Sequence, residues 1–427
     1  MMVVIYQTLK IIAKIGLKLF YPFKVQKSQK YFKTPGPLIL ISNHPNTLID
    51  PLFVASSFYG RLSFLANASL FKNPLLGHIL RLFYCIRIER KQDNDGQVVN
   101  NEEAFEQANR HLREGGAIYI APEGTSIKGK KLLPFKTGTA RIAKSAFMGL
   151  AKGQDLHILP VGITYRNPSF FGTEVAIMAG EPISIRKNWN IISQNGFEGI
   201  RKFTQILEDT IKNLIIHCDS EKEEDLLDRL IEIGSNSKKL KVGRWYEKAK
   251  NWSDELKMLR EKSPEQFEDL HKKVNDYFTK CKNLGVSDYG VAKKHKRGLM
   301  VSSILLALGF PLFLLGLITH LIPIGLLVWI SRHYNKYVEY EATIQLVGGI
   351  LFLPFFYFLQ VKITSLFLVG YGPIYMLLMT IGMGLLAIFY SRRLKKIEER
   401  WAVVNKDVAS LEKLRKQLVG DYLTAYK

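Results

Sequence analysis

Three long apolar stretches in the last third of the chain most restrict what it can fold into. These stretches are residues 298–330, 342–361 and 366–390. Runs of about 20 apolar residues are typical of transmembrane helices. The basic segments that flank them are residues 291–297, 331–336 and 391–396. Because basic flanks tend to stay on the cytoplasmic side, the sequence predicts a membrane region at 298–391 with all three flanks on that side.

The first stretch, 298–330, is too short for two full crossings. Two crossings need ~40 residues, whereas this stretch has about 33. It also contains Pro311, His320 and Pro323. We therefore expect a tight or re-entrant hairpin with its bend near His320–Pro323. A single tilted span is the alternative, and it would place the two flanks on opposite sides.

Residues 35–190 alternate short apolar runs with helical patterns. The expected strands are 38–42, 63–67, 84–89, 117–121, 157–166 and 174–180. The expected helices are 47–58, 69–81, 97–114 and 137–151. This alternation predicts an α/β domain, a mixed sheet with helices on its faces. Because only a short loop joins the last two strands, they are expected to be antiparallel.

Helical patterns occupy the remaining segments. In residues 1–34, Lys10, Lys14 and Lys18 line one side of an expected amphipathic helix, which suits a helix at the membrane interface. Packing of that helix on the domain is the alternative. Residues 191–297 are expected to form a charged helical region. Residues 392–427 are expected to form an amphipathic cytoplasmic helix that packs on helices at 240–285, with a coiled coil as one form of this packing.

The excess of basic residues restricts the classes of partner that the chain can bind. The chain has 60 Lys and Arg residues against 38 Asp and Glu, a formal net charge of +22. Such an excess suits nucleic acid, an anionic membrane surface or a phosphorylated substrate. We do not expect nucleic acid as a partner, because the sequence has no recognised nucleic-acid-binding module and does have apolar runs long enough to cross a lipid bilayer. Its three cysteines, Cys85, Cys218 and Cys281, lack metal-binding spacing and are expected to be free thiols.

Two short motifs contain the residues expected to take part in a reaction. SNHPNTLIDP at 42–51 places His44 after an apolar strand and Asp50 in the following helix. A histidine held by a carboxylate can take a proton from a hydroxyl. APEGTS at 121–126 follows another apolar run, and Gly124 in this turn lets a substrate approach the backbone. A histidine that only caps the next helix is the alternative for the first motif taken alone.

The order of the motifs resembles the glycerophosphate acyltransferases, which include glycerol-3-phosphate and lysophosphatidate enzymes. That family has Asn-His followed by Asp, a block ending in Arg, Phe-Pro-Glu-Gly-Thr-Arg, and an apolar-Pro-Val strand. The counterparts here are Asn43 and His44 with Asp50, CIRIER ending at Arg90, Ala121–Thr125, and Leu159–Val161. The resemblance covers roughly residues 35–185. It implies that His44 and Asp50 are catalytic.

The substrate-binding residues expected from the motifs are Arg90, Glu123, Gly124, Thr125 and Lys136. Arg90 and Lys136 would neutralise a phosphate, and the Glu123 and Thr125 side chains would reach the acceptor.

This chain departs from the family pattern in two places. Five residues, Pro45 to Ile49, separate His44 from Asp50, where four are commonest in the family. Ala121 replaces the usual Phe, and Ser126 replaces the Arg after Glu-Gly-Thr. Both changes resemble the branch with the fungal glycerol-3-phosphate/dihydroxyacetone-phosphate acyltransferases. The missing cation could come from any of four lysines, Lys128, Lys130, Lys131 or Lys136.

The sequence therefore predicts an integral membrane acyltransferase with its catalytic domain on the cytoplasmic face. The expected acceptor is glycerol 3-phosphate or dihydroxyacetone phosphate, with 1-acylglycerol 3-phosphate as the alternative. The expected donor is acyl-CoA or acyl carrier protein, used as co-substrate, and membrane lipid is a further partner. We expect no cofactor and no metal. An inactive membrane scaffold is the alternative of a different class, and the His44, Asp50 and Glu123 set argues against it.

Overall fold

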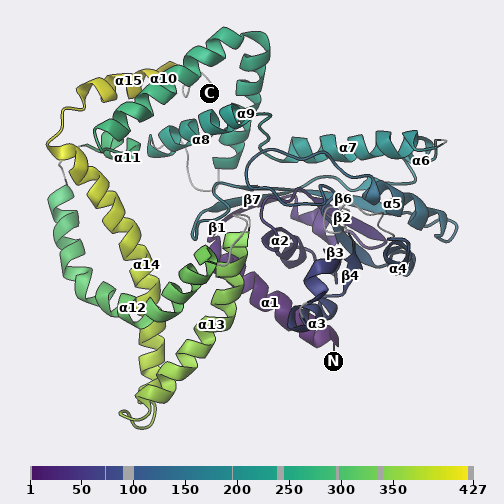
Figure 1. Ribbon diagram of the computed structural model, residues 1–427, viewed down its shortest axis with the longest axis horizontal. Coiled ribbons are helices and arrows are strands. Elements are labelled where there is room, and N and C mark those ends of the chain that lie inside the picture. Colours follow the sequence, from purple (N-terminus) through teal and green to yellow (C-terminus); the bar gives the residue numbers. More distant parts are fainter. Residues whose placement is uncertain are drawn as a thin grey trace. The chain divides into compact units, whose positions relative to one another are not determined.

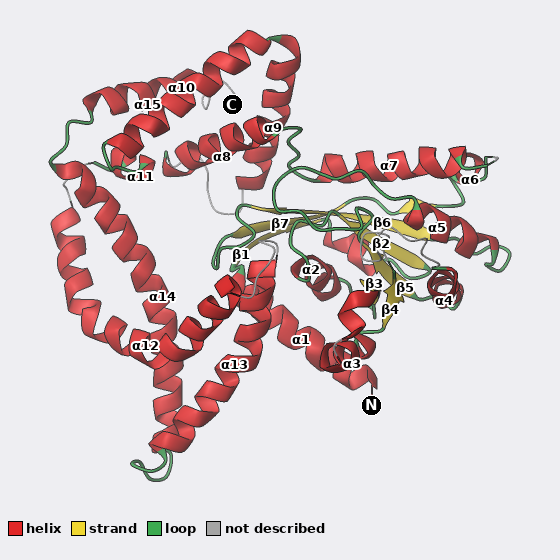
Figure 2. Ribbon diagram, viewed as in Figure 1, coloured by secondary structure: helices red, strands yellow, loops and turns green. Residues whose placement is uncertain are grey.

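The computed structural model describes residues 2–72, 74–89, 101–194, 196–237, 245–294, 298–333 and 340–421. The chain divides into two compact units. The first comprises Met1–His217 with Lys336–Leu346, and the second Cys218–Asn335 with Val347–Lys427. Figure 2 shows that the strands gather in one sheet in the first unit, while the described part of the second is helical.

The first unit is built around an eight-stranded sheet. Seven strands follow the order β1-β7-β6-β2-β5-β3-β4, and β8 pairs with β6 (Figure 1). The strands are β1 (Phe23–Lys27), β2 (Leu38–Ser42), β3 (Ser63–Asn67), β4 (Cys85–Ile88), β5 (Ala117–Ile120), β6 (His157–Tyr165), β7 (Glu174–Ala179) and β8 (Ile183–Ser184). β6, β2, β5, β3 and β4 are parallel to one another, whereas β7 is antiparallel to β6. The predicted mixed α/β sheet, with its antiparallel last pair, is confirmed.

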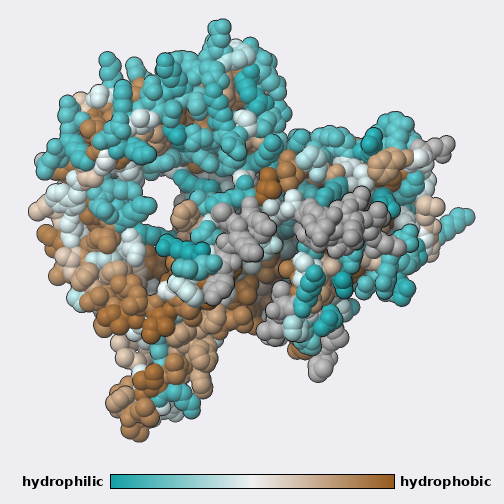
Figure 3. All heavy atoms as spheres, viewed as in Figure 1, coloured by the Kyte–Doolittle hydropathy of each residue, from teal (hydrophilic) through white to brown (hydrophobic). Residues whose placement is uncertain are grey.

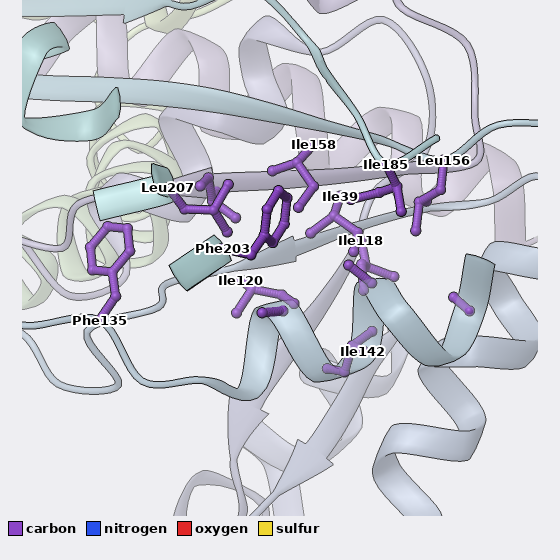
Figure 4. Packing of buried hydrophobic residues seen from close by; sticks show 14 of the residues in the cluster. Ile39, Ile118, Ile120, Phe135, Ile142, Leu156, Ile158, Ile185, Phe203 and Leu207 are labelled. Atoms are coloured by element: carbon purple, nitrogen blue, oxygen red, sulfur yellow. The ribbon is translucent and has the colours of Figure 1, made fainter. Parts of the chain in front are cut away.

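Helices cover both faces of this sheet. They are α1 (Met2–Phe20), α2 (Ile49–Ser57), α3 (Pro74–Leu82), α4 (Glu102–Arg113), α5 (Gly138–Met148), α6 (Trp189–Ile192) and α7 (Glu198–Leu214). Side chains alternate between the faces of a strand, so Ile39 and its neighbours on β5 and β6 point to one side. There, Phe203 of α7 lies among Ile39, Ile118 and Ile158 in a buried cluster that also takes in α4 and α5 (Figure 4).

The N-terminal helix α1 is half buried. Tyr6 and Leu17 are buried on its inner side, and the Lys10 ammonium donates to the carbonyls of Phe58 and Gly60. We expected Lys10 to lie at the lipid headgroups. The structure instead uses it to satisfy two carbonyls at the end of α2, so α1 packs on the domain along this side, as the alternative supposed.

The sheet begins earlier than expected. We placed the start of the α/β domain at residue 35, but β1 at Phe23–Lys27 pairs in parallel with β7. The sequence FKVQK has two lysines in five residues and is mostly exposed, which is typical of an edge strand that ends a sheet. The domain also extends further at its other end, because α7, which we assigned to the charged helical region, packs in the core of the sheet.

The second unit starts with charged helices. They are α8 (Glu221–Asn236), α9 (Trp245–Lys262), α10 (Pro264–Asn283) and α11 (Asp288–Ala292). Asp288 is buried and holds them together, because its carboxylate accepts bonds from Tyr277 of α10, Asn236 of α8 and Arg415 of α15 (Ala409–Asp421). The predicted amphipathic tail thus includes α15, which packs on α10.

Three helices are long and apolar enough to cross a membrane. They are α12 (Leu299–His333), α13 (Glu341–Thr364) and α14 (Gly372–Val404). Their surface is hydrophobic, and it accounts for much of the brown area in Figure 3. The last of them continues well past residue 390, where we expected the apolar span to end.

The first of these helices departs from the expected hairpin. α12 is one helix of 35 residues that contains Pro311 and Pro323, and Figure 1 shows it sharply bent. Proline removes a backbone hydrogen bond and bends a helix without ending it when neighbouring helices support it. The two arms of the hairpin that we expected at 298–330 are therefore the two halves of one bent helix.

The two arms of α12 pack on different helices. In the first arm, the Leu306 carbonyl accepts a 2.8 Å bond from the Tyr390 hydroxyl of α14. In the second, His320 Nε2 lies 2.9 Å from the Tyr357 hydroxyl of α13, and Leu327 packs on the same helix. The first arm of α12 thus packs on α14, and the second arm packs on α13.

Candidate active site

The ends of β2 and β5 bring the two motifs together. The strands pair in parallel with Leu38 beside Ala117, an offset of 79 residues. The same offset separates His44 from Glu123, and the His44 amide donates a 2.6 Å hydrogen bond to Glu123 Oε1. The pairing register thus continues past the strands into the loops. Both motifs lie at the carboxyl edge of the parallel strands, where α/β sheets bind ligands.

His44 and Asp50 form the expected pair. His44 Nδ1 lies 3.0 Å from Asp50 Oδ2, and the same oxygen accepts a 2.7 Å bond from the Asn46 amide. The other oxygen, Oδ1, accepts a 2.7 Å bond from the Tyr165 hydroxyl. Burial raises the pKa of Tyr165, so this phenol stays protonated and donates. Asp50 is fully buried, whereas the His44 side chain keeps 14% of its surface exposed.

The extra residue between His44 and Asp50 is absorbed in the loop. Thr47 has a φ of +33°, a conformation that costs a β-branched residue strain. Its amide donates a 3.1 Å bond to the Ser126 hydroxyl, again at the 79-residue offset. Ser126, which stands where the family has Arg, therefore supports the loop that carries the pair.

Glu123 forms two hydrogen bonds within the protein. Its Oε1 accepts from the His44 amide and its Oε2 accepts a 2.8 Å bond from the Leu133 amide. The side chain is 4% exposed, and burial raises its pKa to about 7. Both oxygens are thus used within the protein. Glu123 thus links the His44 loop to Leu133, and the contact with an acceptor that we expected from it stays a prediction.

The turn after Glu123 lies beside the His44 and Asp50 pair. Gly124 has a φ of +70°, which favours glycine, and a Cβ there would lie 2.6 Å from the Lys136 ammonium. The structure therefore brings Lys136 over the turn. Thr125 is partly exposed next to it. Arg90 lies outside the described residues, so its expected role stays a prediction.

Several residues of the site were not foreseen. Tyr165 ends β6, and Tyr21 follows α1 and accepts a 2.8 Å bond from Asn46 Nδ2. Asn43 exchanges two 2.8 Å hydrogen bonds with the backbone of Ile163. A tyrosine that ends a long apolar strand is a signal that could have pointed to Tyr165. Asn43 belongs to the Asn-His motif, but its bonds to Ile163, like the bond of Tyr21 to Asn46, join residues far apart in the sequence, which no local pattern shows.

This geometry suits general-base chemistry. With Nδ1 bonded to Asp50, the His44 ring can accept a proton at Nε2, for which the described part of the chain provides no hydrogen-bond partner. The carboxylate fixes the tautomer and stabilises the imidazolium that forms. The pair can therefore activate a hydroxyl of a second molecule.

Part of the chain is similar to known proteins. Residues 24–164 match the family model for acyltransferases. A probable 1-acyl-sn-glycerol-3-phosphate acyltransferase of Mycoplasma genitalium is 34% identical over 133 residues, 30% of this chain and 44% of that protein. A lyso-ornithine lipid O-acyltransferase of Brucella abortus is 34% identical over 131 residues, 30% of this chain and 45% of that protein. This chain thus spans less than half the length of both relatives.

Two further matches are more distant. Glycerol-3-phosphate O-acyltransferase 1 of Saccharomyces cerevisiae is 23% identical over 271 residues, 42% of this chain and 36% of that protein. The crystal structure of the 1-acyl-sn-glycerophosphate acyltransferase of Thermotoga maritima aligns with a TM-score of 0.36 and 21% identity, covering 48% of this chain and 79% of that one. The ordered motifs, which run from Asn43 to Val161, all lie within the residues that match the acyltransferase family model.

Proposed function

We propose that the chain transfers a fatty acyl group from a thioester to a hydroxyl of a glycerol-phosphate-type acceptor. The observation that carries the proposal is the His44 and Asp50 pair, with Nδ1 and Oδ2 3.0 Å apart at the carboxyl edge of the sheet. An inactive scaffold would have no need of a buried carboxylate that holds a partly exposed histidine. The match of residues 24–164 to the acyltransferase family supports the same reaction class.

In the proposed reaction, His44 Nε2 takes the proton of the acceptor hydroxyl as its oxygen attacks the thioester carbonyl. Asp50 holds the resulting imidazolium. When the tetrahedral intermediate collapses, the C–S bond breaks and the imidazolium returns the proton to the leaving thiolate. The products are an ester and a free thiol, and no side chain is acylated.

The phosphate of the acceptor is proposed to bind at Lys136 and Arg90. Lys136 is placed over Gly124, beside the turn that carries Glu123. Cations of both types bind phosphate through charge-assisted hydrogen bonds, and Arg adds a bidentate fork.

Two acceptors compete within the proposal. The motifs resemble glycerol-3-phosphate/dihydroxyacetone-phosphate enzymes, and a yeast glycerol-3-phosphate O-acyltransferase aligns over 42% of this chain. The Mycoplasma relative, at 34% identity, is instead named for 1-acyl-sn-glycerol 3-phosphate. The higher identity favours 1-acylglycerol 3-phosphate, our alternative from the sequence, as the first acceptor to assay.

We also propose that the catalytic domain faces the cytoplasm. The basic flanks of the apolar helices support this orientation. Single cysteines at 334 and 427, in a chain freed of Cys85, Cys218 and Cys281, should stay unlabelled by an impermeant thiol reagent on intact cells. Labelling at 334 alone would contradict the orientation.

The activity is tested with the purified full chain in detergent. Labelled acyl-CoA and acyl carrier protein thioesters are offered with glycerol 3-phosphate, dihydroxyacetone phosphate, 1-acylglycerol 3-phosphate and a lyso-ornithine lipid in turn. We expect an ester product with a phosphate-bearing acceptor. Exclusive use of the lyso-ornithine lipid, which lacks a phosphate, would contradict the proposed acceptor class. No product with any pair would contradict the reaction.

A further inference from the structure

A second pocket lies at the opposite edge of the sheet from His44. It measures about 340 Å³ and is lined by residues of three segments, 32–36, 58–61 and 111–117. These segments lead into β2, β3 and β5, so they lie at the amino ends of the parallel strands. His44 and Glu123 follow the carboxyl ends of β2 and β5. Strands of four to five residues separate the two edges by roughly 13–17 Å. The pocket is therefore distinct from the candidate active site.

The ionisable side chains that line this pocket include three basic ones. Lys33, Arg61 and His111 line it, together with the aromatic ring of Tyr59. The Lys33 ammonium lies 5.0 Å from the centroid of the Tyr59 ring. Burial lowers the pKa of His111, and the charge of Arg61 lowers it further. Arg61 Cζ lies 5.9 Å from the centroid of the Tyr84 ring. A pocket of this size lined by two cations can hold an anionic group.

The cations of the pocket are not neutralised within the described residues. Neither Lys33 nor Arg61 forms an ion pair in that part of the chain. The acid that acts on this pocket is Glu114, which is exposed and raises the pKa of His111 less than burial lowers it. The His111 ring is bonded to the Ser63 hydroxyl at 3.2 Å. The positive charges of Lys33 and Arg61 are therefore available to a ligand.

The surroundings of the pocket favour a lipid as the source of the anion. The Lys10 side chain of α1 donates to the Phe58 and Gly60 carbonyls on the pocket's rim, so α1 lies beside it. The outer side of α1 exposes an apolar stripe, Val4, Ile11, Ile15 and Leu19, each more than half exposed. Tyr59 on the rim is 67% exposed. An apolar helix face with an exposed tyrosine and cations beside it is typical of a surface that meets lipid headgroups.

We propose that Lys33 and Arg61 bind the phosphate of an anionic glycerolipid in this second pocket. The apolar stripe of α1 would lie among the acyl chains while the pocket holds the headgroup. The site is independent of catalysis at His44, so it anchors or orients the domain on an anionic membrane surface whether or not the proposed reaction occurs.

Hydrogen exchange of the full chain in neutral detergent tests the site locally. The segments 32–36 and 58–61 are followed while soluble short-chain phosphatidate, short-chain phosphatidylcholine or inorganic phosphate is titrated. The test variant is Lys33→Gln with Arg61→Gln. The matched control, Lys152→Gln with Lys187→Gln, removes two exposed charges elsewhere on the same unit. A ligand at His44 does not interfere, because the readout comes from the pocket segments.

We expect phosphatidate to protect both segments and phosphatidylcholine not to. The double variant should need at least about tenfold more phosphatidate, since charge-assisted hydrogen bonds are lost, while the control should match the wild type. Equal protection by inorganic phosphate would overturn the lipid as the source. Equal protection by phosphatidylcholine, no protection, or a double variant that binds like the wild type would overturn the site. A double variant that unfolds is replaced by Arg61→Lys, which should bind more weakly than the wild type.

Discussion

Replacing Asp50 by Asn should separate the charge of this residue from its geometry. Asp50 Oδ2 accepts from His44 Nδ1 and from the Asn46 amide, and Oδ1 accepts from Tyr165. In Asp50→Asn, the amide oxygen should keep the Oδ2 position, because an NH₂ group there would face the Asn46 N–H. The Tyr165 hydroxyl can rotate to accept from the new NH₂ group. His44 therefore keeps its tautomer and loses only the negative charge beside its imidazolium.

The size of the effect follows from this bond pattern. A hydrogen bond to a charged group is worth about 1.5–3 kcal/mol, so kcat/KM should fall roughly 10- to 200-fold. The free energy of unfolding should change little. Asp50→Ala would instead leave three buried donors without acceptors, at about 1–3 kcal/mol each. That total of about 3–9 kcal/mol is a large part of a typical stability of 5–15 kcal/mol. Asp50→Ala is thus expected to unfold the domain.

The assay measures initial rates of acyl transfer and thermal unfolding of the same preparation. The control variant is Asp288→Asn, which removes another buried carboxylate that accepts from a tyrosine hydroxyl, in the helical second unit. It should lower the unfolding temperature and leave kcat/KM of the folded protein unchanged. A folded Asp50→Asn protein with wild-type kcat/KM would refute the role given to Asp50.

Three further predictions concern Glu123, Gly124 and Arg90. Because burial raises the pKa of Glu123 to about 7 from 4.5, the folded state binds this proton more tightly. The unfolding temperature should therefore fall from pH 5 to pH 8, and less so in Glu123→Gln. Gly124→Ala should displace Lys136 and raise the acceptor KM, whereas Gly153→Ala, with φ +95° and open space, should only lower stability. Arg90→Ala should lower kcat/KM for the acceptor on the order of 10–200-fold without changing the donor KM, and an unchanged acceptor KM would remove Arg90 from the site.

The strands of the sheet could be predicted because they are continuous apolar runs. LILIS at 38–42 and AIYI at 117–120 are buried on both faces, which is what a parallel strand between helices requires. β1 was missed because an edge strand needs no such run, and FKVQK is exposed and charged. A single span at 299–333 was only our alternative to a hairpin, because two prolines in an apolar stretch suggest a break, and its packing on α13 and α14 could not be seen in the sequence.

The site could be predicted as far as its motifs reach. His44 and Asp50 share one motif, and their bond forms despite the unusual spacing because Thr47 takes a left-handed conformation. The role of Glu123 could not be predicted in this way. Its bond to the His44 amide becomes apparent only when the β2–β5 register aligns the two loops, and its bond to the Leu133 amide depends on how the loop after β5 folds back.

The most direct test of the account is the rate of acyl transfer by His44→Ala. A general base contributes roughly 10²- to 10⁴-fold, so turnover should fall by that factor while thermal unfolding and membrane insertion stay unchanged. His157→Ala is the matched control, because His157 begins β6 at the opposite edge of the same sheet, and this variant should keep wild-type turnover. A folded His44→Ala protein with near-full turnover would contradict the account.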